Sequence, residues 1–328
     1  MVKNETFWNG KKVLVTGADG FIGSHLTEAL LEKGAKTSIF IKGDSQNTFK
    51  KNRLGNLDAV QDKLSDVIKG NIGSEDCQQQ IKKNDPEIIF HLAAEAYVPF
   101  SFDHPLETLK TNLIGTLNVL HAARDLKNVE QIVCTSSSEV YGTAMKDKID
   151  EEHPLNPTSP YAASKAAADR YCYSYWKTYG LPIAIIRPFN CYGPRHSYDV
   201  IPKFIQLALE NKPLTIYGDG NQSRDFTYVS DTVEGFLTMG SRKEAIGKAV
   251  NFGSGKDYTI NETSKLIKEL SGSSSEIVHE KERPAEVNRL ICDYGLAKKL
   301  FGWEPKISLE EGLRRNIEWE KQMLTKRQ

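Results

Sequence analysis

The chain has 328 residues, of which 39% are hydrophobic and 26% are charged. A chain of this length and composition buries enough apolar surface to fold without disulfide or metal support. Lysine and arginine together number 43, as do aspartate and glutamate, so the formal net charge is zero. This balance removes the electrostatic argument for a general nucleic-acid or membrane-surface binder, because such proteins usually carry a basic excess.

The five cysteines are an odd number, widely spaced and without a Cys-x-x-Cys pair. This pattern argues against a disulfide framework or a zinc cluster and is typical of a reducing compartment. The first ten residues are polar, so we expect no signal peptide. No stretch approaches the ~18 continuous apolar residues of a membrane span. We therefore expect a cytoplasmic protein with no metal site, no nucleic-acid partner and no membrane association.

The first half of the chain alternates short apolar segments with longer helical patterns. A buried strand is predicted over 13–16 and, after a glycine-rich turn, a helix over 24–33 that ends at Gly34. Further strands of similar length are predicted at 38–41, 66–69, 88–91 and 132–135. This alternation implies right-handed crossovers and a parallel sheet that helices cover on both faces.

Between the last two of these strands, Asp103 and Pro105 open another predicted helix. Its leucines recur at steps of three and four residues, which predicts one buried stripe along the helix. The leucines of this stripe are Leu106, Leu109, Leu113, Leu117 and Leu120.

Beyond residue 188, prolines and glycines divide the chain into shorter pieces. The last helix begins with Ser308 and Glu311 in the spacing of a capping box. Other helices are predicted at 200–210, 231–239 and 262–270. We therefore predict an α/β fold with a Rossmann-type doubly wound parallel sheet over 1–187. A smaller C-terminal α/β lobe follows over 188–328, with some chain crossing back to the first domain.

Three glycines, Gly17, Gly20 and Gly23, follow the first predicted strand and open the first helix. Gly17 allows a tight turn, Gly20 lets the backbone approach a pyrophosphate, and Gly23 lets helix and strand pack closely. The N–H groups at the helix N-terminus, around Phe21 and Ile22, would then bind the phosphates. A lone glycine triplet is weak evidence, but its place in the first strand–helix unit predicts a dinucleotide site.

The end of the second strand bears on the choice between NAD and NADP. NAD sites usually have an acidic residue there, whereas a basic residue accommodates the 2′-phosphate of NADP. Ile41 occupies this place, Lys42 follows as the candidate contact, and Asp44 lies two residues further on. The choice therefore stays open. The carboxyl ends of the third and fourth strands supply further candidates for the cofactor site: Asn71, Ile72, Ala93 and Ala94.

Ser159 and Pro160 begin a helix that carries Tyr161 and Lys165 one turn apart on the same face. An ammonium beside a phenol favours the phenolate, so Tyr161 could exchange a proton near neutral pH. Lys165 could also hold the ribose of a nicotinamide nucleotide. A tyrosine and a lysine at this spacing are common by accident, and the pair gains weight only from the other two motifs.

Hydroxyl groups follow the fifth strand, in residues 135–138, and Glu139 comes next. Taken alone this is a serine-rich turn. A hydroxyl at a strand end, together with the tyrosine and lysine and a glycine-marked cofactor site, suits chemistry at a carbonyl or carbinol carbon. Ser137, Ser138 and Glu139 are the candidates.

With these motifs the chain resembles the extended short-chain dehydrogenase/reductase family, specifically its nucleotide-sugar epimerases, 4,6-dehydratases and decarboxylases. The likeness extends from Lys11 to about Trp319. Further matching segments are 91–94 (HLAA), 111–116 (TNLIGT), 187–195 (RPFNCYGPR), 224–226 (RDF), 283–284 (RP) and 302–305 (GWEP). The resemblance implies a tightly bound NAD or NADP that is reduced and reoxidised within one turnover, and a nucleoside-diphosphate sugar as substrate.

The resemblance also implies roles for individual residues. Tyr161 would be the base at the C4 hydroxyl, Lys165 its pKa partner and ribose anchor, and Ser137 the hydroxyl paired with the sugar O4. Asn112 and Pro188 would join the cofactor site. Asn190, Arg224 and Arg283 would hold the diphosphate, and Val200, Thr215 and Tyr217 would lie at the nucleotide base. A homodimer formed through the 105–125 and 160–179 segments would be usual for the family.

The activity depends on residues 137–139, which are Ser, Ser and Glu. Dehydratases and decarboxylases of the family usually have an acid at the position of Glu139, whereas 4-epimerases usually have a serine followed by small residues. Oxidation at C4 acidifies the C5 proton, and a carboxylate at Glu139 could remove it while the C6 hydroxyl leaves as water. We favour a 4,6-dehydratase, with a UDP-glucose or UDP-hexosamine type 4-epimerase as the alternative and a UDP-glucuronate decarboxylase below both.

Two other classes stay open on the sequence. A dehydrogenase or reductase with net turnover would consume free cofactor stoichiometrically. A non-catalytic dinucleotide-binding protein on the same fold would not need the tyrosine, the lysine and the hydroxyl together.

Overall fold

The computed structural model describes residues 6–42, 54–282 and 286–327. The chain divides into two compact units. The first contains residues up to 137 together with 159–187 and 233–250, and the second contains 138–158, 188–232 and the chain from 251 onward. The sequence-based division at residue 187 placed the 138–158 segment in the first domain. It also expected some later chain to cross back to the first domain.

A seven-stranded sheet has the order β11-β6-β5-β4-β1-β2-β3. Its described pairings, from β2–β3 through β5–β6, are parallel, and the predicted Rossmann-type α/β fold is confirmed. The strands are β1 (Lys12–Thr16), β2 (Lys36–Ile41), β3 (Asp66–Lys69), β4 (Ile88–His91), β5 (Gln131–Thr135), β6 (Ile183–Pro188) and β11 (Ala249–Phe252). Every residue of β4 is buried, as expected for a strand that helices cover on both faces.

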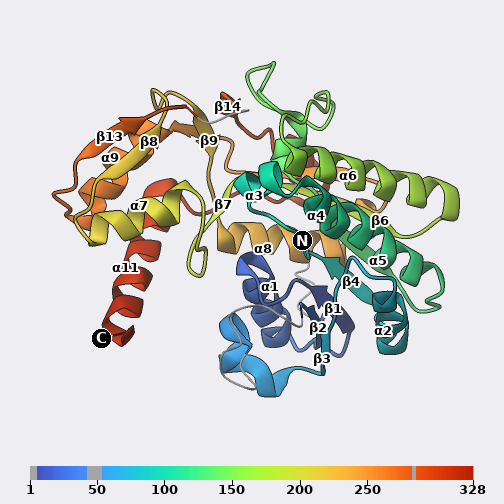
Figure 1. The fold of residues 1–328 in the computed structure, drawn as a ribbon. Helices are drawn as coiled ribbons and strands as arrows, with labels where there is room; N and C mark the ends of the chain where they lie inside the picture. The colour runs from blue at the N-terminus through green and yellow to red at the C-terminus, as the bar shows by residue number, and fades with distance from the viewer. Residues whose placement is uncertain (1–5, 43–53, 283–285, 328) are drawn as a thin grey trace. The chain divides into compact units, whose positions relative to one another are not determined.

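Helices of the first unit cover both faces of this sheet (Figure 1). On one face α2 (Asp76–Asn84) contacts α5 (Gly115–Arg124), which contacts α6 (Pro160–Tyr179). A core of aliphatic residues from these helices and from β1, β4 and β5 fills this layer. On the other face lie α1 (Phe21–Glu32) and α8 (Val229–Ser241), where the Phe236 ring packs edge-on against Phe90 at 6.4 Å between centroids. The helix predicted from residue 24 begins three residues earlier, at Phe21.

The predicted leucine stripe is wrong in its first half. The segment forms α3 (Val98–Asp103), α4 (Pro105–Leu109), a π-type turn η2 (Lys110–Ile114) and then α5. Leu106 is 80% exposed and Leu109 is 41% exposed. A π-type turn inserts one residue and shifts the phase of the helix, so the spacing before and after it does not describe one face.

Short strands and helices build the second unit. Its helices include α7 (Val200–Leu209), α9 (Ile260–Ser271), α10 (Gly295–Phe301) and α11 (Leu309–Arg327), and α9 contacts both α7 and α11. Its small sheets are formed by β7 (Cys191–Tyr192) with β10 (Thr227–Tyr228), by β8 (Leu214–Tyr217) with β13 (Ile277–Glu280), and by β9 (Ser223–Asp225) between β12 (Asp257–Thr259) and β14 (Arg289–Leu290). The short 3-10 turn η3 (Ser138–Tyr141) also belongs to the second unit, whereas η1 (Gly55–Lys63) and η4 (Lys243–Ala245) belong to the first.

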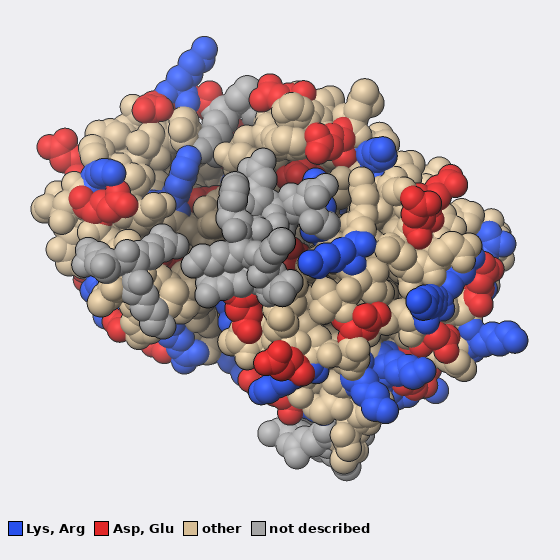
Figure 2. All heavy atoms as spheres, turned by 60° about the horizontal axis from the view of Figure 1, so that its bottom comes forward, with Lys and Arg blue, Asp and Glu red and all other residues tan. Residues whose placement is uncertain are grey.

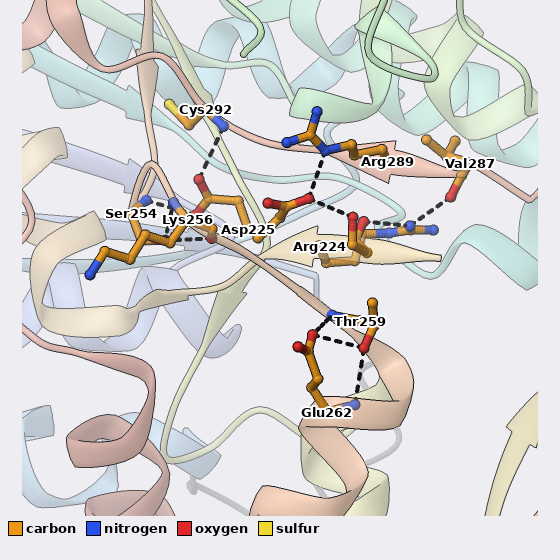
Figure 3. A network of polar contacts seen from close by, with 11 residues as sticks. Arg224, Asp225, Ser254, Lys256, Thr259, Glu262, Val287, Arg289 and Cys292 are labelled. Carbon is orange, nitrogen blue, oxygen red and sulfur yellow. Dashed lines mark hydrogen bonds and ion pairs between the residues drawn. The ribbon is translucent and has the colours of Figure 1, made fainter. Parts of the chain in front are cut away.

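Polar contacts fix the core of the second unit (Figure 3). The buried Asp225 carboxylate accepts hydrogen bonds from the main-chain N–H groups of Ser254 (2.7 Å), Gly255 (2.8 Å) and Cys292 (3.0 Å). At the start of α9, Thr259 and Glu262 form a reciprocal capping box. At the start of α11, the predicted cap Ser308 accepts through Oγ from the Glu311 N–H at 3.3 Å.

Charged side chains of both signs lie intermixed on the face of the molecule that Figure 2 shows. None of the helices in the described part of the chain is long and apolar enough to cross a membrane. All five cysteines carry free thiols.

Candidate functional site

The turn between β1 and α1 requires glycine at two of its three glycine positions. Gly17 has φ +68°, and a Cβ there would lie 2.8 Å from the Cα of Ala93. A Cβ on Gly23 would lie 2.1 Å from the carbonyl oxygen of Gly17. Gly20 has an ordinary φ of −72°, and its Cβ would lie 3.2 Å from the same oxygen. The fold therefore requires glycine at positions 17 and 23. At position 20 the fold does not require glycine, and the missing side chain leaves room for a ligand to approach the backbone.

The start of α1 has the properties of an anion site. Gly20 occupies the N-cap without a side-chain cap, and the first turn holds no acidic residue. Phe21 and Ile22 begin the helix and are partly exposed. The N–H groups of a helix start and the positive end of its dipole favour a diphosphate. The close-packed glycine turn and this uncapped helix start together fit the pyrophosphate of a dinucleotide.

The neighbouring strand ends carry the other candidates for the cofactor site. Lys42 is exposed directly after the buried Ile41, while Asp44 lies outside the described residues. Ala93 donates its N–H to Thr16 Oγ1 at 3.2 Å, and Ala94 follows it, partly exposed.

After β3, the exposed Asn71 accepts through Oδ1 from the Gly73 N–H at 2.9 Å. Ile72 is buried, and its carbonyl accepts from Asn118 Nδ2 at 2.9 Å. Asn71 therefore presents its side chain at the surface, while Ile72 packs inside. Their contact with a cofactor stays a prediction.

Helix α6 holds the tyrosine and the lysine. Ser159 caps it by accepting through Oγ from the Ala162 N–H at 3.1 Å, as predicted, and Pro160 is its first residue. Tyr161 is 9% exposed and Lys165 is 5% exposed. The Lys165 ammonium donates to the main-chain carbonyl oxygen of Thr135. Burial lowers the pKa of Lys165 to about 8, so this ammonium releases its proton more readily than an exposed lysine.

Asn112 lies in the π-type turn and is buried. Its Oδ1 accepts from the Glu95 N–H at 2.7 Å, and its Nδ2 donates to the Glu95 carbonyl at 3.1 Å and to Ser164 Oγ at 2.9 Å. The amide is thus used in hydrogen bonds within the protein. Its predicted contact with the cofactor stays a prediction.

The hydroxyl cluster follows β5. Ser137 and Ser138 are 9% and 2% exposed, and Ser138 begins the turn η3. Two further hydroxyls in this segment, Thr135 Oγ1 and Ser136 Oγ, are buried and have no hydrogen-bond partner within the described part of the chain. Unpaired buried hydroxyls are rare in proteins, so this segment offers hydrogen-bonding groups to a ligand.

Glu139 lies within the electrostatic range of three charged groups of the second unit. Burial raises the pKa of its carboxyl group, the Arg224 charge lowers it, and the Glu286 and Asp199 charges raise it again, with a net rise. A carboxyl group with a raised pKa is better suited to take up a proton than an exposed one.

Arg224 is held by carboxylate and carbonyl oxygens. Its Nη2 donates to Glu286 Oε1 at 2.6 Å, and its Nη1 donates to the carbonyls of Val287 (2.6 Å) and Ser223 (3.0 Å). Figure 3 shows the guanidinium extending along β9 toward Val287. The pair of Arg224 and Glu286 is only slightly exposed, with side-chain values of 12% and 16%.

The remaining predicted substrate contacts are in the second unit. Asn190 is partly exposed, but its Oδ1 is buried and accepts no hydrogen bond from any described residue. Val200 is the first residue of α7 and is partly exposed. Thr215 and Tyr217 lie on the same, partly exposed side of β8, which alternates with buried residues. Pro188 ends β6 and is partly exposed, and Arg283 lies outside the described residues.

Several polar residues of these sites were not predicted from the sequence. Ser164 lies three residues after Tyr161 and links Asn112 to helix α6, and Glu286 bonds to Arg224. Thr16, His91 and Thr116 form a buried hydrogen-bonded chain. The position of His91 at the end of a predicted strand was a signal, but its partners are more than twenty residues away in the sequence.

Comparison with known proteins places the chain in a family. Residues 14–316 match the family model described as GDP-mannose 4,6 dehydratase. A putative UDP-glucose 4-epimerase of Methanocaldococcus jannaschii is 35% identical over 313 residues, which cover 94% of this chain and 98% of that protein.

Two solved structures match with similar coverage. The UDP-glucose 4-epimerase of Thermotoga maritima with UDP-glucose has a TM-score of 0.87 and 32% identity, over 95% of this chain and 99% of that one. The dTDP-glucose 4,6-dehydratase of Bacillus anthracis in complex with NAD has a TM-score of 0.85 and 31% identity, over 95% and 97%. Because sequence and structure agree over nearly the whole length, the chain belongs to the extended short-chain dehydrogenase/reductase family, among its nucleotide-sugar epimerases and 4,6-dehydratases.

Proposed function

We propose that this protein is a nucleotide-sugar 4,6-dehydratase that binds NAD and a nucleoside-diphosphate hexose. The observation that carries the choice of reaction is Glu139, a carboxyl group whose pKa is raised by burial and which directly follows the hydroxyl cluster in the sequence. A 4-epimerase has no need of such a base, whereas elimination of water requires one.

The first unit would hold the dinucleotide. The glycine turn, whose backbone leaves no room for a Cβ at Gly17 or Gly23, and the uncapped start of α1 fit its pyrophosphate. Related dehydratase and epimerase structures contain NAD, which supports NAD over NADP here. When bound, the nicotinamide would accept a hydride from C4 of the sugar and return it later in the same turnover.

Tyr161 would take the proton of the C4 hydroxyl as the C4 hydride departs. Lys165, buried one turn further along α6, would stabilise the phenolate through its positive charge and hold the ribose of the cofactor. Ser137 would donate a hydrogen bond to the sugar O4. In the resulting 4-keto sugar, the C5 proton is acidified by the adjacent carbonyl group.

Glu139 would then remove the C5 proton and pass it to the C6 hydroxyl, which leaves as water with Ser138 as a hydrogen-bonding neighbour; the proton held by Tyr161 is then available for C5. Return of the hydride to C6 and of a proton to C5 completes a 4-keto-6-deoxy sugar without net oxidation. The raised pKa of Glu139 supports its gaining and losing a proton during this sequence.

The second unit would bind the nucleoside diphosphate. Arg224 supplies a guanidinium, which binds phosphate oxygens in a forked geometry, and Asn190 and Arg283 would share the diphosphate. The partly exposed Val200, Thr215 and Tyr217 would contact the base. A related epimerase structure contains UDP-glucose, and a related dehydratase is named for dTDP-glucose, so uridine and thymidine nucleotides are the first candidates.

A 4-epimerase is the second candidate. It is favoured by the serine at 138, where dehydratases of this family commonly have an aspartate, and by relatives that are named as epimerases. In that case the 4-keto sugar would rotate in the site between removal and return of the hydride, so that the hydride returns to the opposite face of C4. Glu139 would then have no part in proton transfer.

One screen separates these reactions. The purified protein is incubated with UDP-, dTDP-, GDP- and CDP-hexoses, and the products are followed by mass spectrometry and proton NMR. Loss of one water identifies a dehydratase, loss of carbon dioxide from a UDP-hexuronate identifies a decarboxylase, and unchanged mass with altered ring couplings identifies an epimerase. Glu139→Gln should abolish water loss, with Glu152→Gln, which removes an exposed carboxylate, as the control. Stoichiometric consumption of added NADH would instead indicate a net reductase.

The protein is also proposed to form a homodimer. The exposed apolar side chains of α3, α4 and α6 include Phe102 (39%), Leu106 (80%), Leu109 (41%) and Tyr171 (45%). Helices α3 and α4 both contact α6, so these side chains belong to neighbouring helices of one layer. Large exposed apolar side chains on neighbouring helices fit a surface that a second copy of the chain would cover.

A further inference from the structure

A buried chain of hydrogen bonds begins at the cofactor turn in the first unit. The Ala93 N–H donates to Thr16 Oγ1 at 3.2 Å, and Thr16 Oγ1 lies 2.8 Å from His91 Nδ1. On the other side of the ring, His91 Nε2 lies 3.0 Å from Thr116 Oγ1. Thr116 in turn bonds to the carbonyl oxygen of Asn112 at 2.6 Å. These groups connect the ends of β1 and β4 to the π-type turn.

The partners of His91 determine its tautomer. The carbonyl oxygen of Asn112 can only accept, so the Thr116 hydroxyl proton is donated to it, and Thr116 Oγ1 must accept from His91. Nε2 of His91 therefore carries a proton. In the neutral ring Nδ1 is then an acceptor, and the Thr16 hydroxyl donates to it while accepting from the Ala93 N–H. Each donor in the chain finds one acceptor.

The chain continues from the π-type turn to the helix that carries Tyr161. Asn112 Nδ2 donates to Ser164 Oγ at 2.9 Å, and the Ser164 hydroxyl donates to the Tyr161 carbonyl oxygen at 2.7 Å. The orientation of the Asn112 amide is fixed as well, because Glu95 offers it one N–H and one carbonyl group. The main chain at Tyr161 is thus connected to the cofactor turn through side chains that are all buried.

We propose that His91, as the neutral Nε2–H tautomer, is a positioning residue that fixes the main chain at Tyr161 relative to the glycine turn. Its role in turnover rests on the proposed function, whereas its tautomer and its structural coupling do not. The ring is 3% exposed, and it joins hydrogen-bonding groups of two strands to the π-type turn. Such fixed placement matters because a displacement of about 1 Å at a reacting group can cost on the order of 100-fold in rate.

A neutral ring also suits the lysine in the same unit. Burial, and after it the positive charge of Lys165, lowers the pKa of His91 to about 3. A protonated imidazole would present a second N–H to Thr16, which would break the ordered sequence of donors. It would also add a cation close to the Lys165 ammonium. The network therefore holds only one positive charge in this region.

The tautomer can be tested without a substrate. With ¹⁵N-labelled histidine, NMR of the full chain at neutral pH should show the His91 Nε2 shift of a protonated nitrogen and the Nδ1 shift of an unprotonated one. His91→Phe identifies the resonances. A protonated Nδ1, or a cationic ring at neutral pH, would overturn the proposal whether or not the protein is a dehydratase.

The coupling to Tyr161 is tested with two pairs of variants. His91→Phe keeps the ring volume and removes both hydrogen bonds, whereas His91→Gln keeps one amide donor. Thr116→Val removes the hydroxyl, whereas Thr116→Ser keeps it. We expect faster amide hydrogen exchange at the start of α6 in the Phe and Val variants, with recovery in the Gln and Ser variants. If His91→Phe does not fold, the Thr116 pair answers the same question.

For the substrate identified by the screen, we expect kcat to fall about 10- to 100-fold in His91→Phe and Thr116→Val. KM and NAD affinity should change by less than about threefold, since neither side chain is assigned a ligand contact. The double variant should cost less than the product of the single effects, because both break the same chain. Folded variants with unchanged hydrogen exchange at α6 and kcat within about twofold of the parent would contradict the proposal.

Discussion

The side-chain ammonium of Lys165 donates a hydrogen bond to the main-chain carbonyl oxygen of Thr135. This bond ties α6 to the end of β5, where the hydroxyl cluster begins. It uses one of the three ammonium protons, and the other two are left for the phenol and the ribose of the proposed mechanism. The same contact therefore holds α6 at the end of β5 and places the Lys165 ammonium beside the hydroxyl cluster.

Activity should fall as the pH rises through about 8. Burial lowers the pKa of Lys165 to about 8, so the ammonium that stabilises the Tyr161 phenolate is present below this pH and lost above it. The check is kcat measured from about pH 6 to about pH 10. Lys165→Met should be inactive at every pH while remaining folded by circular dichroism. Full activity of the parent at pH 10 would remove the lysine charge from the mechanism.

The three glycines of the first turn should separate folding from cofactor binding. Gly23→Ala should lower the free energy of unfolding by more than about 2 kcal/mol, because its Cβ would lie 2.1 Å from the Gly17 carbonyl oxygen. Gly20 has an ordinary φ, so Gly20→Ala should lower the free energy of unfolding by less than about 1 kcal/mol. It should nevertheless weaken NAD binding about tenfold, equivalent to ~1.4 kcal/mol, because the added methyl group keeps the pyrophosphate from the backbone.

Gly272→Ala is the matched control for this series. Gly272 ends α9 with φ +69°, and nothing lies within 4 Å of its added Cβ. We expect a loss of about 1 kcal/mol from backbone strain alone and unchanged NAD affinity. Calorimetric titration with NAD and urea denaturation measure both quantities. Unchanged NAD affinity in Gly20→Ala would place the pyrophosphate elsewhere.

The pair of Asp169 and Arg187 should be a major source of stability for α6. Their atoms form two hydrogen bonds, Nε to Oδ2 at 2.8 Å and Nη2 to Oδ1 at 3.0 Å, and both side chains are almost fully buried. Asp169→Asn leaves the guanidinium buried without its counter-charge and should cost about 3–5 kcal/mol in urea denaturation. Glu310→Gln is the control, since it breaks an exposed ion pair with Arg314 that should contribute less than about 1 kcal/mol.

The same pair predicts the direction of the acid sensitivity. Burial raises the pKa of the Asp169 carboxyl, but the hydrogen bonds and charge of Arg187, with those of Arg170, bring it below its ordinary value. Its contribution is therefore complete above the unfolded pKa and is lost as the pH falls through the folded one. Asp169→Asn should show a shallower loss of stability with acid than the parent. Parallel pH curves for the two proteins would contradict this assignment.

Local patterns were sufficient for much of this fold. Gly17 and Gly23 were predicted from their spacing after an apolar strand, and their packing follows from contacts within a few residues and with the adjacent strand. Five of the seven strands of the sheet were predicted because parallel strands buried on both faces are almost continuously apolar, whereas β6 and β11 were not predicted. The cap at Ser159 was also predicted from a local pattern, because Ser159 and Ala162 are only three residues apart.

Other features depend on contacts that no local pattern contains. Leu106 and Leu109 precede the phase shift of the π-type turn and are exposed, although their spacing matches that of the partly buried Leu117 and the buried Leu120 after it. His91 finds Thr16 across 75 positions of the sequence, and Arg224 finds Glu286 across 62. These pairings depend on strand order and on the paths of loops. A single sequence can therefore point to such residues but does not show which of them contact each other.

Glu286 should weaken the binding of the nucleotide sugar. Its carboxylate lies 2.6 Å from Nη2 of Arg224 and partly neutralises the charge that the diphosphate would use. Glu286→Gln keeps the side-chain size and should lower the KM for the nucleotide sugar about three- to tenfold at low salt. The gain should shrink as salt is added. Arg224→Gln should raise the KM instead, and a raised KM in Glu286→Gln would mean that this carboxylate serves to orient Arg224.

The apolar side chains of α4 should determine the oligomeric state. Leu106 is 80% exposed and Leu109 is 41% exposed, which is the arrangement expected where a partner covers them. We expect the parent protein to sediment as a dimer and the double variant Leu106→Glu/Leu109→Glu to sediment as a monomer, because charges buried without partners are strongly unfavourable. Met145→Glu is the control, since Met145 is 70% exposed in the second unit and should leave the dimer intact. A parent that sediments as a monomer, or a double variant that stays dimeric, would show that this surface is not the interface.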